Sequence, residues 1–136
     1  MPTRIDHIGI AVSDIEAALR VYRDALGLEL ESIEEIASQR LTTHHLRIGE
    51  THIELLYPTD PNSVISRFLA KRGPGIHHIA LAVDEFEGER KRLIAAGLEP
   101  IGEPSAGAGG KRIQFFHPRT TEGVLLEICS KENPVD

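Results

Sequence analysis

The stretch IDHIGIAV, residues 5–12, returns in nearly the same form as IHHIALAV at residues 76–83. At an offset of 71 residues, five of the eight positions carry identical amino acids, and one of the five is a histidine, His7 in the first copy and His78 in the second. Each copy alternates small and bulky side chains, as a β-strand with two different faces does. The chain is therefore predicted to consist of two related halves, each opening with a strand that carries a histidine.

The same succession of elements follows each repeated strand. A capping-box spacing opens a predicted helix in each half, and a glycine suited to the left-handed C-terminal position ends it. The box residues are Ser13 with Glu16 and Asp84 with Glu87, and the glycines are Gly27 and Gly97. Further strands are predicted at 41–48, 51–57, 111–117 and 123–129, with weaker signals directly after each helix. A short helix capped by Asn62 or Ser63 joins the halves.

These elements predict an α+β fold class, with tandem modules of strand, helix and three strands. The chain of 136 residues is long enough to bury one core. We therefore expect a single domain over 1–136, with the first module at about 1–68 and the second at about 74–132.

Composition narrows the classes of partner. The net charge is −6 without any run of like charges, which disfavours a nucleic-acid partner or an anionic membrane surface. No apolar stretch approaches the ~20 residues of a membrane span, and no signal segment is recognised. Cys129 is the single cysteine, so an intramolecular disulfide is excluded. A cytoplasmic protein without nucleic-acid or membrane partners is expected.

Two acidic residues occupy matching places in the last strand of each half. Glu54 in THIELLY and Glu127 in VLLEIC both sit inside apolar runs, where an ionised carboxylate is costly unless it is paired or bound to a metal. Together with His7 and His78 they form a plausible four-ligand site for zinc, cobalt, nickel, manganese or iron, with two octahedral positions open to a chelating substrate. The alternatives are ordinary polar strand histidines and edge-strand glutamates facing water.

The duplicated pattern resembles the vicinal oxygen chelate (glyoxalase) superfamily, whose paired βαβββ modules form a cupped mixed sheet around a metal site. Within it, the chain is most similar to the methylmalonyl-CoA epimerase family, over essentially its whole length. The stretches that carry this resemblance are IDHIGIAV, GETHIELLYPT, SVISRFLAKRGPGIHHIALAV, GGKRIQFFHPR and GVLLEI. The resemblance implies a divalent Co, Zn, Ni or Mn ion as cofactor, with His7, Glu54, His78 and Glu127 as ligands. Some epimerases carry glutamine at the position of Glu54.

The activity that this resemblance implies is interconversion of (2R)- and (2S)-methylmalonyl-CoA. Loss of the α-proton, a metal-stabilised enolate and return of a proton to the opposite face require two proton-transfer groups. Glu127 is implied as one of them. Several family members place a glutamate where this chain has Thr43, so His45, on the same strand face, is predicted as the replacement. His44 and His52 are interpreted as bystanders.

A coenzyme A thioester also needs contacts for its phosphates. Lys111 and Arg112 follow a glycine-rich loop, and Arg119 lies two residues after His117 at the end of a predicted strand. These three cations are predicted to bind substrate. A homodimer is expected, because modules of this kind often pair across subunits.

Two other functions use the same fold. Bacterial lactoylglutathione lyases have a similar His/Glu/His/Glu set, but they tend toward a DPDG-type turn before the final strand, where this chain has HPRTTEG. A metal-free binding protein, such as an antibiotic-sequestering one, is disfavoured by four intact ligands. Ring-cleaving dioxygenases are disfavoured too, because they use three protein ligands for iron.

Overall fold

Residues 1–131 are described by a computed structural model, in which they form two compact units. The first unit runs from His7 to His77, and the second unit combines Met1–Asp6 with the chain from His78 onward. The predicted end of the second module, residue 132, lies outside the described residues. The single domain with modules at about 1–68 and 74–132 stays a prediction.

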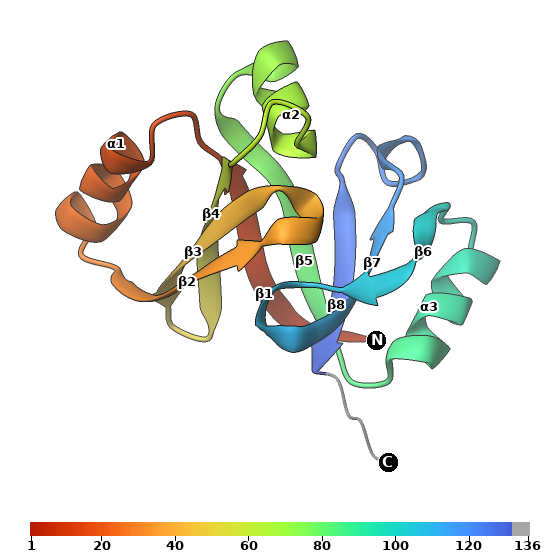
Figure 1. The fold of residues 1–136 in the computed structure, drawn as a ribbon. Helices are drawn as coiled ribbons and strands as arrows, with labels where there is room; N and C mark the ends of the chain where they lie inside the picture. The colour runs from red at the N-terminus through yellow and green to blue at the C-terminus, as the bar shows by residue number, and fades with distance from the viewer. Residues whose placement is uncertain (132–136) are drawn as a thin grey trace. The chain divides into compact units, whose positions relative to one another are not determined.

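The first unit contains a four-stranded mixed sheet in the order β2-β3-β4-β1. Its strands are β2 (Glu29–Ile36), β3 (Leu41–Ile48), β4 (Thr51–Pro58) and the part of β1 (Pro2–Ala11) that begins at His7. Strand β1 runs parallel to β4, whereas the other neighbours are antiparallel. Helix α1 (Ile15–Leu19), continued by a π-helical segment, packs its Leu19 into a core with Leu46 and Leu55. Figure 1 shows α1 on one side of β2–β4.

Helix α2 (Val64–Arg72) covers another part of the first unit. Its buried Ile65 packs against Leu41 and Leu56 and against Ala11 of β1. The small-residue side of β1 is therefore filled by a helix at its Ala11 end.

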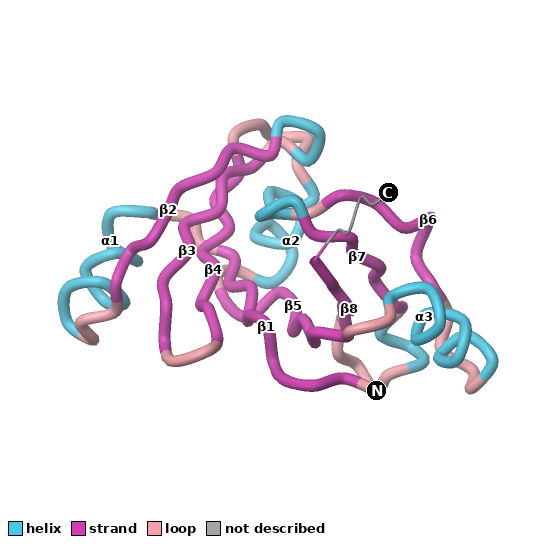
Figure 2. The backbone as a smooth tube through the Cα atoms, turned by 90° about the horizontal axis from the view of Figure 1, so that it is seen from below, coloured by secondary structure: helices cyan, strands magenta, loops and turns pink. Residues whose placement is uncertain are grey.

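The second unit repeats this design in the order β5-β8-β7-β6. Its strands are β5 (Gly75–Val83, from His78 onward), β6 (Pro100–Ala106), β7 (Lys111–Phe116) and β8 (Leu126–Lys131). Strand β5 is parallel to β8, and α3 (Phe86–Ala95) buries Phe86 against Phe116 and Ile128. Figures 1 and 2 both show α3 beside β6.

The strand register is the same in both units. In the first, Gly9 of β1 is the partner of Glu54 on β4, and in the second, Ala80 of β5 is the partner of Glu127 on β8. A small residue two positions after the repeated histidine thus faces the repeated glutamate. The structure confirms the predicted α+β class and the succession of strand, helix and three strands in each half.

The predicted helix caps are wrong by one residue in both halves. Asp14, not Ser13, caps α1, and Glu85, not Asp84, caps α3. In each case the carboxylate of the later residue accepts from the backbone N–H three positions on, which satisfies one of the helix's unpaired donors.

Glycines with positive φ lie at the ends of several helices and strands. Gly27 and Gly97 have φ of 75° and 106°, as predicted for helix ends. Ser63, one of two predicted candidates, caps α2. The last strand begins at Leu126, later than predicted, because Gly123 at φ 92° belongs to a turn.

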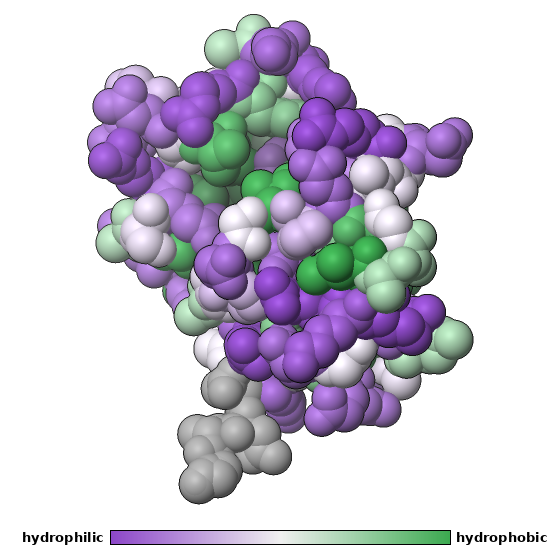
Figure 3. Space-filling model, turned by 90° about the vertical axis from the view of Figure 1, so that its right-hand side faces the viewer, coloured by the Kyte–Doolittle hydropathy of each residue, from purple (hydrophilic) through white to green (hydrophobic). Residues whose placement is uncertain are grey.

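Large hydrophobic side chains are exposed on several elements. Figure 3 shows one face, on which hydrophilic side chains predominate and hydrophobic ones appear in small groups. Among residues 1–131, no helix is both long and apolar enough to cross a bilayer. The exposed large hydrophobic residues include Ile5, Val21, Leu26, Ile33, Ile48, Val64, Ile76, Ile94, Ile101 and Val124.

Candidate active site

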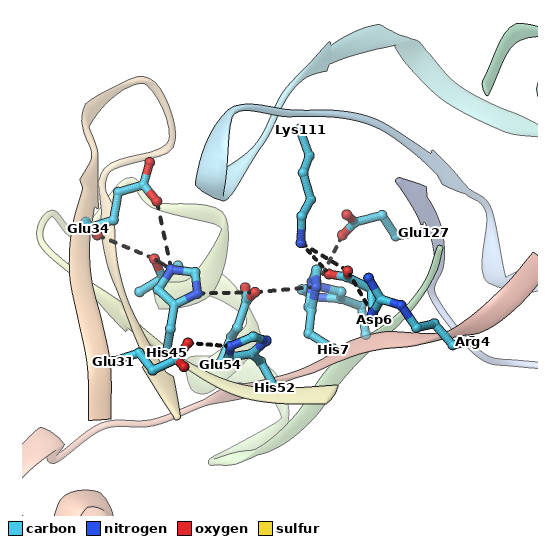
Figure 4. A network of polar contacts seen from close by, with 12 residues as sticks. Arg4, Asp6, His7, Glu31, Glu34, His45, His52, Glu54, Lys111 and Glu127 are labelled. Carbon is cyan, nitrogen blue, oxygen red and sulfur yellow. Dashed lines mark hydrogen bonds and ion pairs between the residues drawn. The ribbon is translucent and has the colours of Figure 1, made fainter. Parts of the chain in front are cut away.

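One histidine–glutamate pair lies in the first unit. Nδ1 of His7 is 3.3 Å from Oε2 of Glu54, and Nδ1 of His45 is 3.4 Å from the same oxygen. Figure 4 shows the two imidazoles on opposite sides of this carboxylate. Adjacent strands bring them together, since β1 is parallel to β4 and β3 pairs His45 directly with Glu54. The structure thus places His45 against Glu54, and its role in a site stays a prediction.

The second unit contains the equivalent pair. Nε2 of His78 is 3.2 Å from Oε1 of Glu127, and the two side chains are only 6% and 3% exposed. Sequence reasoning missed Phe115, whose ring meets the His78 ring edge-on at 5.3 Å between centroids. The repeat could have pointed to Phe115, because it occupies the place in the second unit that His45 has in the first. Phe115 on β7 is the partner of Glu127, as His45 on β3 is the partner of Glu54.

The donor set of the two pairs suits a divalent transition metal. His7, Glu54, His78 and Glu127 are all at least nine-tenths buried, where carboxylates need a cation or hydrogen-bond donors. Imidazole nitrogens and carboxylate oxygens are ligands for Zn, Co, Ni and Mn. The nearby thiol of Cys129 is a poor additional ligand, because burial and the charges of Asp6 and Glu127 raise its pKa and keep it protonated.

Lys111 holds a buried carboxylate that the sequence did not single out. Its Nζ lies 2.9 and 2.8 Å from the two oxygens of Asp6, and the Asp6 side chain is 3% exposed. Figure 4 shows Lys111 reaching down to Asp6. Arg4 lies 3.4 Å from the same residue. This lysine therefore already compensates a buried charge.

The other two predicted substrate-binding cations have different surroundings. Arg119 makes a two-pronged ion pair with Glu99, at 2.9 and 2.8 Å, and these hydrogen bonds lower the pKa of the exposed Glu99 carboxyl. The guanidinium of Arg112 instead lies 4.6 Å from the centroid of the Phe86 ring. His117 ends its strand as predicted, accepting from the backbone N–H of Arg119.

The two histidines interpreted as bystanders have different surroundings. His52 is the sheet partner of His7, and its ring meets that of His45 edge-on at 6.3 Å between centroids. His52 Nε2 contacts Glu31 at 2.8 Å near the surface. His44 is buried, and its Nδ1 has no hydrogen-bond partner among the described residues. Burial, and next the charge of His45, lower the pKa of His44, whereas Glu16 opposes this shift.

The free energy of unfolding is expected to fall as pH drops below about 7, because His44 binds a proton more readily in the unfolded chain. The pKa of His44 is lower in the folded protein than its value of about 6.5 in the unfolded chain. The neutral side chain therefore contributes fully to stability above that pH, and this contribution is lost on acidification. The free energy of unfolding then changes by at most about 1.4 kcal/mol per pH unit. His44→Leu should flatten this slope, measured by urea unfolding in chelator from about pH 7.5 to 5.5. Identical slopes for both proteins would contradict the prediction.

Comparison with known proteins agrees with this architecture. The family model described as the Glyoxalase/Bleomycin resistance protein/Dioxygenase superfamily matches residues 4–128. The Cereibacter sphaeroides ethylmalonyl-CoA/methylmalonyl-CoA epimerase is 39% identical over 128 residues, covering 92% of this chain and 96% of that protein.

Solved structures agree as well. A variant of Streptomyces coelicolor methylmalonyl-CoA epimerase in complex with 2-nitronate-propionyl-CoA is 35% identical, with a TM-score of 0.91 over 96% of this chain and 99% of that one. Mycobacterium tuberculosis methylmalonyl-CoA epimerase is 36% identical, with a TM-score of 0.90 over 96% and 89%.

Proposed function

The chain belongs to the glyoxalase/bleomycin resistance protein/dioxygenase superfamily, and from this membership we propose that it is an epimerase that interconverts (2R)- and (2S)-methylmalonyl-CoA. Relatives named as epimerases of this substrate cover nearly the whole chain. The observation that carries the proposal is the buried histidine–glutamate pair, which occurs once in each unit and in the same strand register.

We propose that His7, Glu54, His78 and Glu127 hold one divalent ion, of cobalt, zinc, nickel or manganese. A bound divalent ion supplies positive charge for the thioester and carboxylate oxygens, which lowers the cost of removing the hydrogen between them. Burial of all four side chains supports the proposal, since a dry site strengthens such charge interactions.

The proton transfers are assigned to two residues of the chain. Glu127 is proposed to take or return the proton on one face of the α-carbon, and His45 on the other. An imidazole suits this task because its ordinary pKa lies close to neutral pH. His45 also lies beside Glu54, with a side chain that is 12% exposed.

Among the cations proposed to meet the phosphates of coenzyme A, Arg112 is the strongest candidate. Its guanidinium lies over the Phe86 ring, and a contact with an aromatic ring can be kept while N–H donors of the guanidinium bind a phosphate. To bind a phosphate, Lys111 would have to give up its ion pair with the buried carboxylate of Asp6, and Arg119 its ion pair with Glu99. We rank them second.

We also propose a cytoplasmic homodimer. A coenzyme A thioester as substrate suits an enzyme of the cytoplasm, and paired modules suit association of two copies. Analytical ultracentrifugation of the metal-loaded protein tests the oligomeric state.

The proposed activity predicts exchange at one carbon. Metal-loaded protein in deuterated water, given a single epimer of methylmalonyl-CoA, should incorporate one deuterium at the α-carbon and produce the other epimer. One residue removes the hydrogen, and the atom returned to the opposite face comes from a second residue that has exchanged with solvent. Mass spectrometry and NMR follow incorporation and conversion. Absence of exchange, together with formation of lactoylglutathione in a lyase assay, would favour the alternative enzyme class. Absence of both activities would favour a binding protein.

Loss of either histidine should weaken metal binding to a similar degree. Replacing an outer-sphere partner typically costs 10–100-fold in metal affinity, so His7→Ala and His78→Ala, which remove ligands, should each cost more than about 100-fold. Titration with zinc and a competing chelator measures this, and the wild-type protein should bind one ion per chain. Two ions per chain would show that each pair binds its own metal, and tight binding in either variant would exclude that histidine as a ligand.

A further inference from the structure

A buried threonine supports His45 in the first unit. Oγ1 of Thr43 lies 2.9 Å from Nε2 of His45 and 3.4 Å from the backbone oxygen of Glu34. Thr43 is 2% exposed, and both residues lie on the same face of β3. The imidazole is thus held at one nitrogen by a hydroxyl and at the other by the Glu54 carboxylate.

The second unit shows that the fold does not require these polar groups. The register places Phe115 where the first unit has His45, and Ile113 where it has Thr43. Phe115 and Ile113 are both apolar, yet β7 pairs with β8 as β3 pairs with β4. Apolar side chains therefore suffice for packing at these two positions. The hydroxyl of Thr43 and the imidazole of His45 need another explanation than packing.

Hydrogen-bond chemistry decides which nitrogen of His45 carries the proton. An ionised carboxylate only accepts, and two carboxylates face this ring: Glu54 at 3.4 Å from Nδ1 and Glu34 at 3.7 Å from Nε2. Glu54 is buried and nearer, whereas Glu34 is 41% exposed and beyond hydrogen-bond distance, so Nδ1 is assigned as the protonated nitrogen of the neutral ring. Nε2 is then an acceptor. The Thr43 hydroxyl can donate either to Nε2 or to the Glu34 oxygen, and the contact with Nε2 is shorter by half an ångström.

We propose that Thr43 is a positioning residue for His45, whose hydroxyl donates to Nε2 and holds the neutral ring in its Nδ1-protonated form. Nε2 is thereby the basic nitrogen, and it takes a proton from substrate once the Thr43 hydroxyl turns to the backbone oxygen of Glu34 and frees the Nε2 lone pair. In this arrangement Glu54 orients His45 in addition to its proposed role in binding metal. This inference rests on the proposed function, because it takes Glu54 as an ionised ligand and His45 as a proton-transfer group.

The tautomer can be measured without turnover. Long-range ¹⁵N–¹H correlation spectra of zinc-loaded, ¹⁵N-labelled protein at about pH 8, above the ordinary titration range of histidine, distinguish the two forms. His45, assigned by its loss in His45→Gln, should show a protonated Nδ1 and a bare Nε2. Thr43→Val, which keeps the shape but removes the hydroxyl, should give a mixture of tautomers, and Thr43→Ser should restore the single form.

Kinetics give the second readout. Thr43→Val should lower kcat by about tenfold with KM changed less than about twofold, a part of the 10² to 10⁴ that a proton-transfer group contributes. Thr43→Ser should recover most of it. Thr42→Val is the matched control, since Thr42 lies on the opposite face of β3 and should change neither readout.

Each result decides something different. A wild-type ring protonated at Nε2, or a Thr43→Val variant with an unchanged tautomer, would overturn the proposal. A changed tautomer with unchanged kcat would overturn the positioning role. If the wild-type protein exchanges no deuterium, the proposed function fails, whereas the spectra still test the contact between Thr43 and His45.

Discussion

Glu127→Gln is expected to slow deuterium incorporation into methylmalonyl-CoA by about 10² to 10⁴, whereas Glu54→Gln should slow it by less than about tenfold. Both glutamates are proposed metal ligands, but only Glu127 is proposed to move a proton, which an amide cannot do. An amide oxygen at position 54 still accepts from His7 and His45, whose Nδ1 atoms both face that side chain.

Metal content is the control for this comparison. Loss of the ion would mimic loss of the base, so single-turnover rates must be compared at equal occupancy, established by elemental analysis. Equal defects in the two variants under that condition would mean that Glu127 is only a ligand. His45 would then be the first residue to test as the sole proton-transfer group, through His45→Gln.

Removal of divalent metal is expected to abolish epimerisation. Negative charge that develops on the thioester oxygen needs a nearby cation, whereas the two buried pairs contribute carboxylates, which are themselves negative. Dialysis against a strong chelator should reduce turnover to background, and Zn²⁺, Co²⁺, Ni²⁺ or Mn²⁺ should restore it to differing degrees. Turnover is measured by conversion of one epimer to the other.

Circular dichroism of the chelated protein separates loss of metal from loss of fold. An unchanged spectrum, with activity regained on addition of metal, is the expected result. Full activity in protein shown by elemental analysis to contain no metal would refute a metal-dependent mechanism.

Strands with residues that favour extended backbone and with a clear turn at their end were predictable from the sequence. The limits of β3 match the prediction at 41–48, because β-branched and hydrophobic residues recur along it and the chain turns at Gly49. Strands β2 and β6 were weakly signalled, since most of their side chains are exposed and their sequences carry glutamates and prolines. The caps at Asp14 and Glu85 were missed because neighbouring residues also had suitable side chains.

The residues of the candidate site that were predictable are those identified by the sequence repeat and by the alternation of side chains along a strand. These two patterns select the histidine–glutamate pairs and His45, which the structure places in contact within each unit. The partners of the cations were not predictable, because Lys111 and Asp6 are 105 residues apart and no local pattern links them. Only the folded chain brings such residues together.

Residues Met1–Asp6 belong to the second unit, although they precede the first in the chain. Thr3 donates to the backbone oxygen of Ala82 at 3.4 Å, and Asp6 accepts from Lys111. A cut between α2 and β5 would therefore divide the second unit. The later fragment would lack the amino-terminal residues that this unit uses, and Lys111 would lose the carboxylate of Asp6. The second half of the chain thus depends on residues that precede the first.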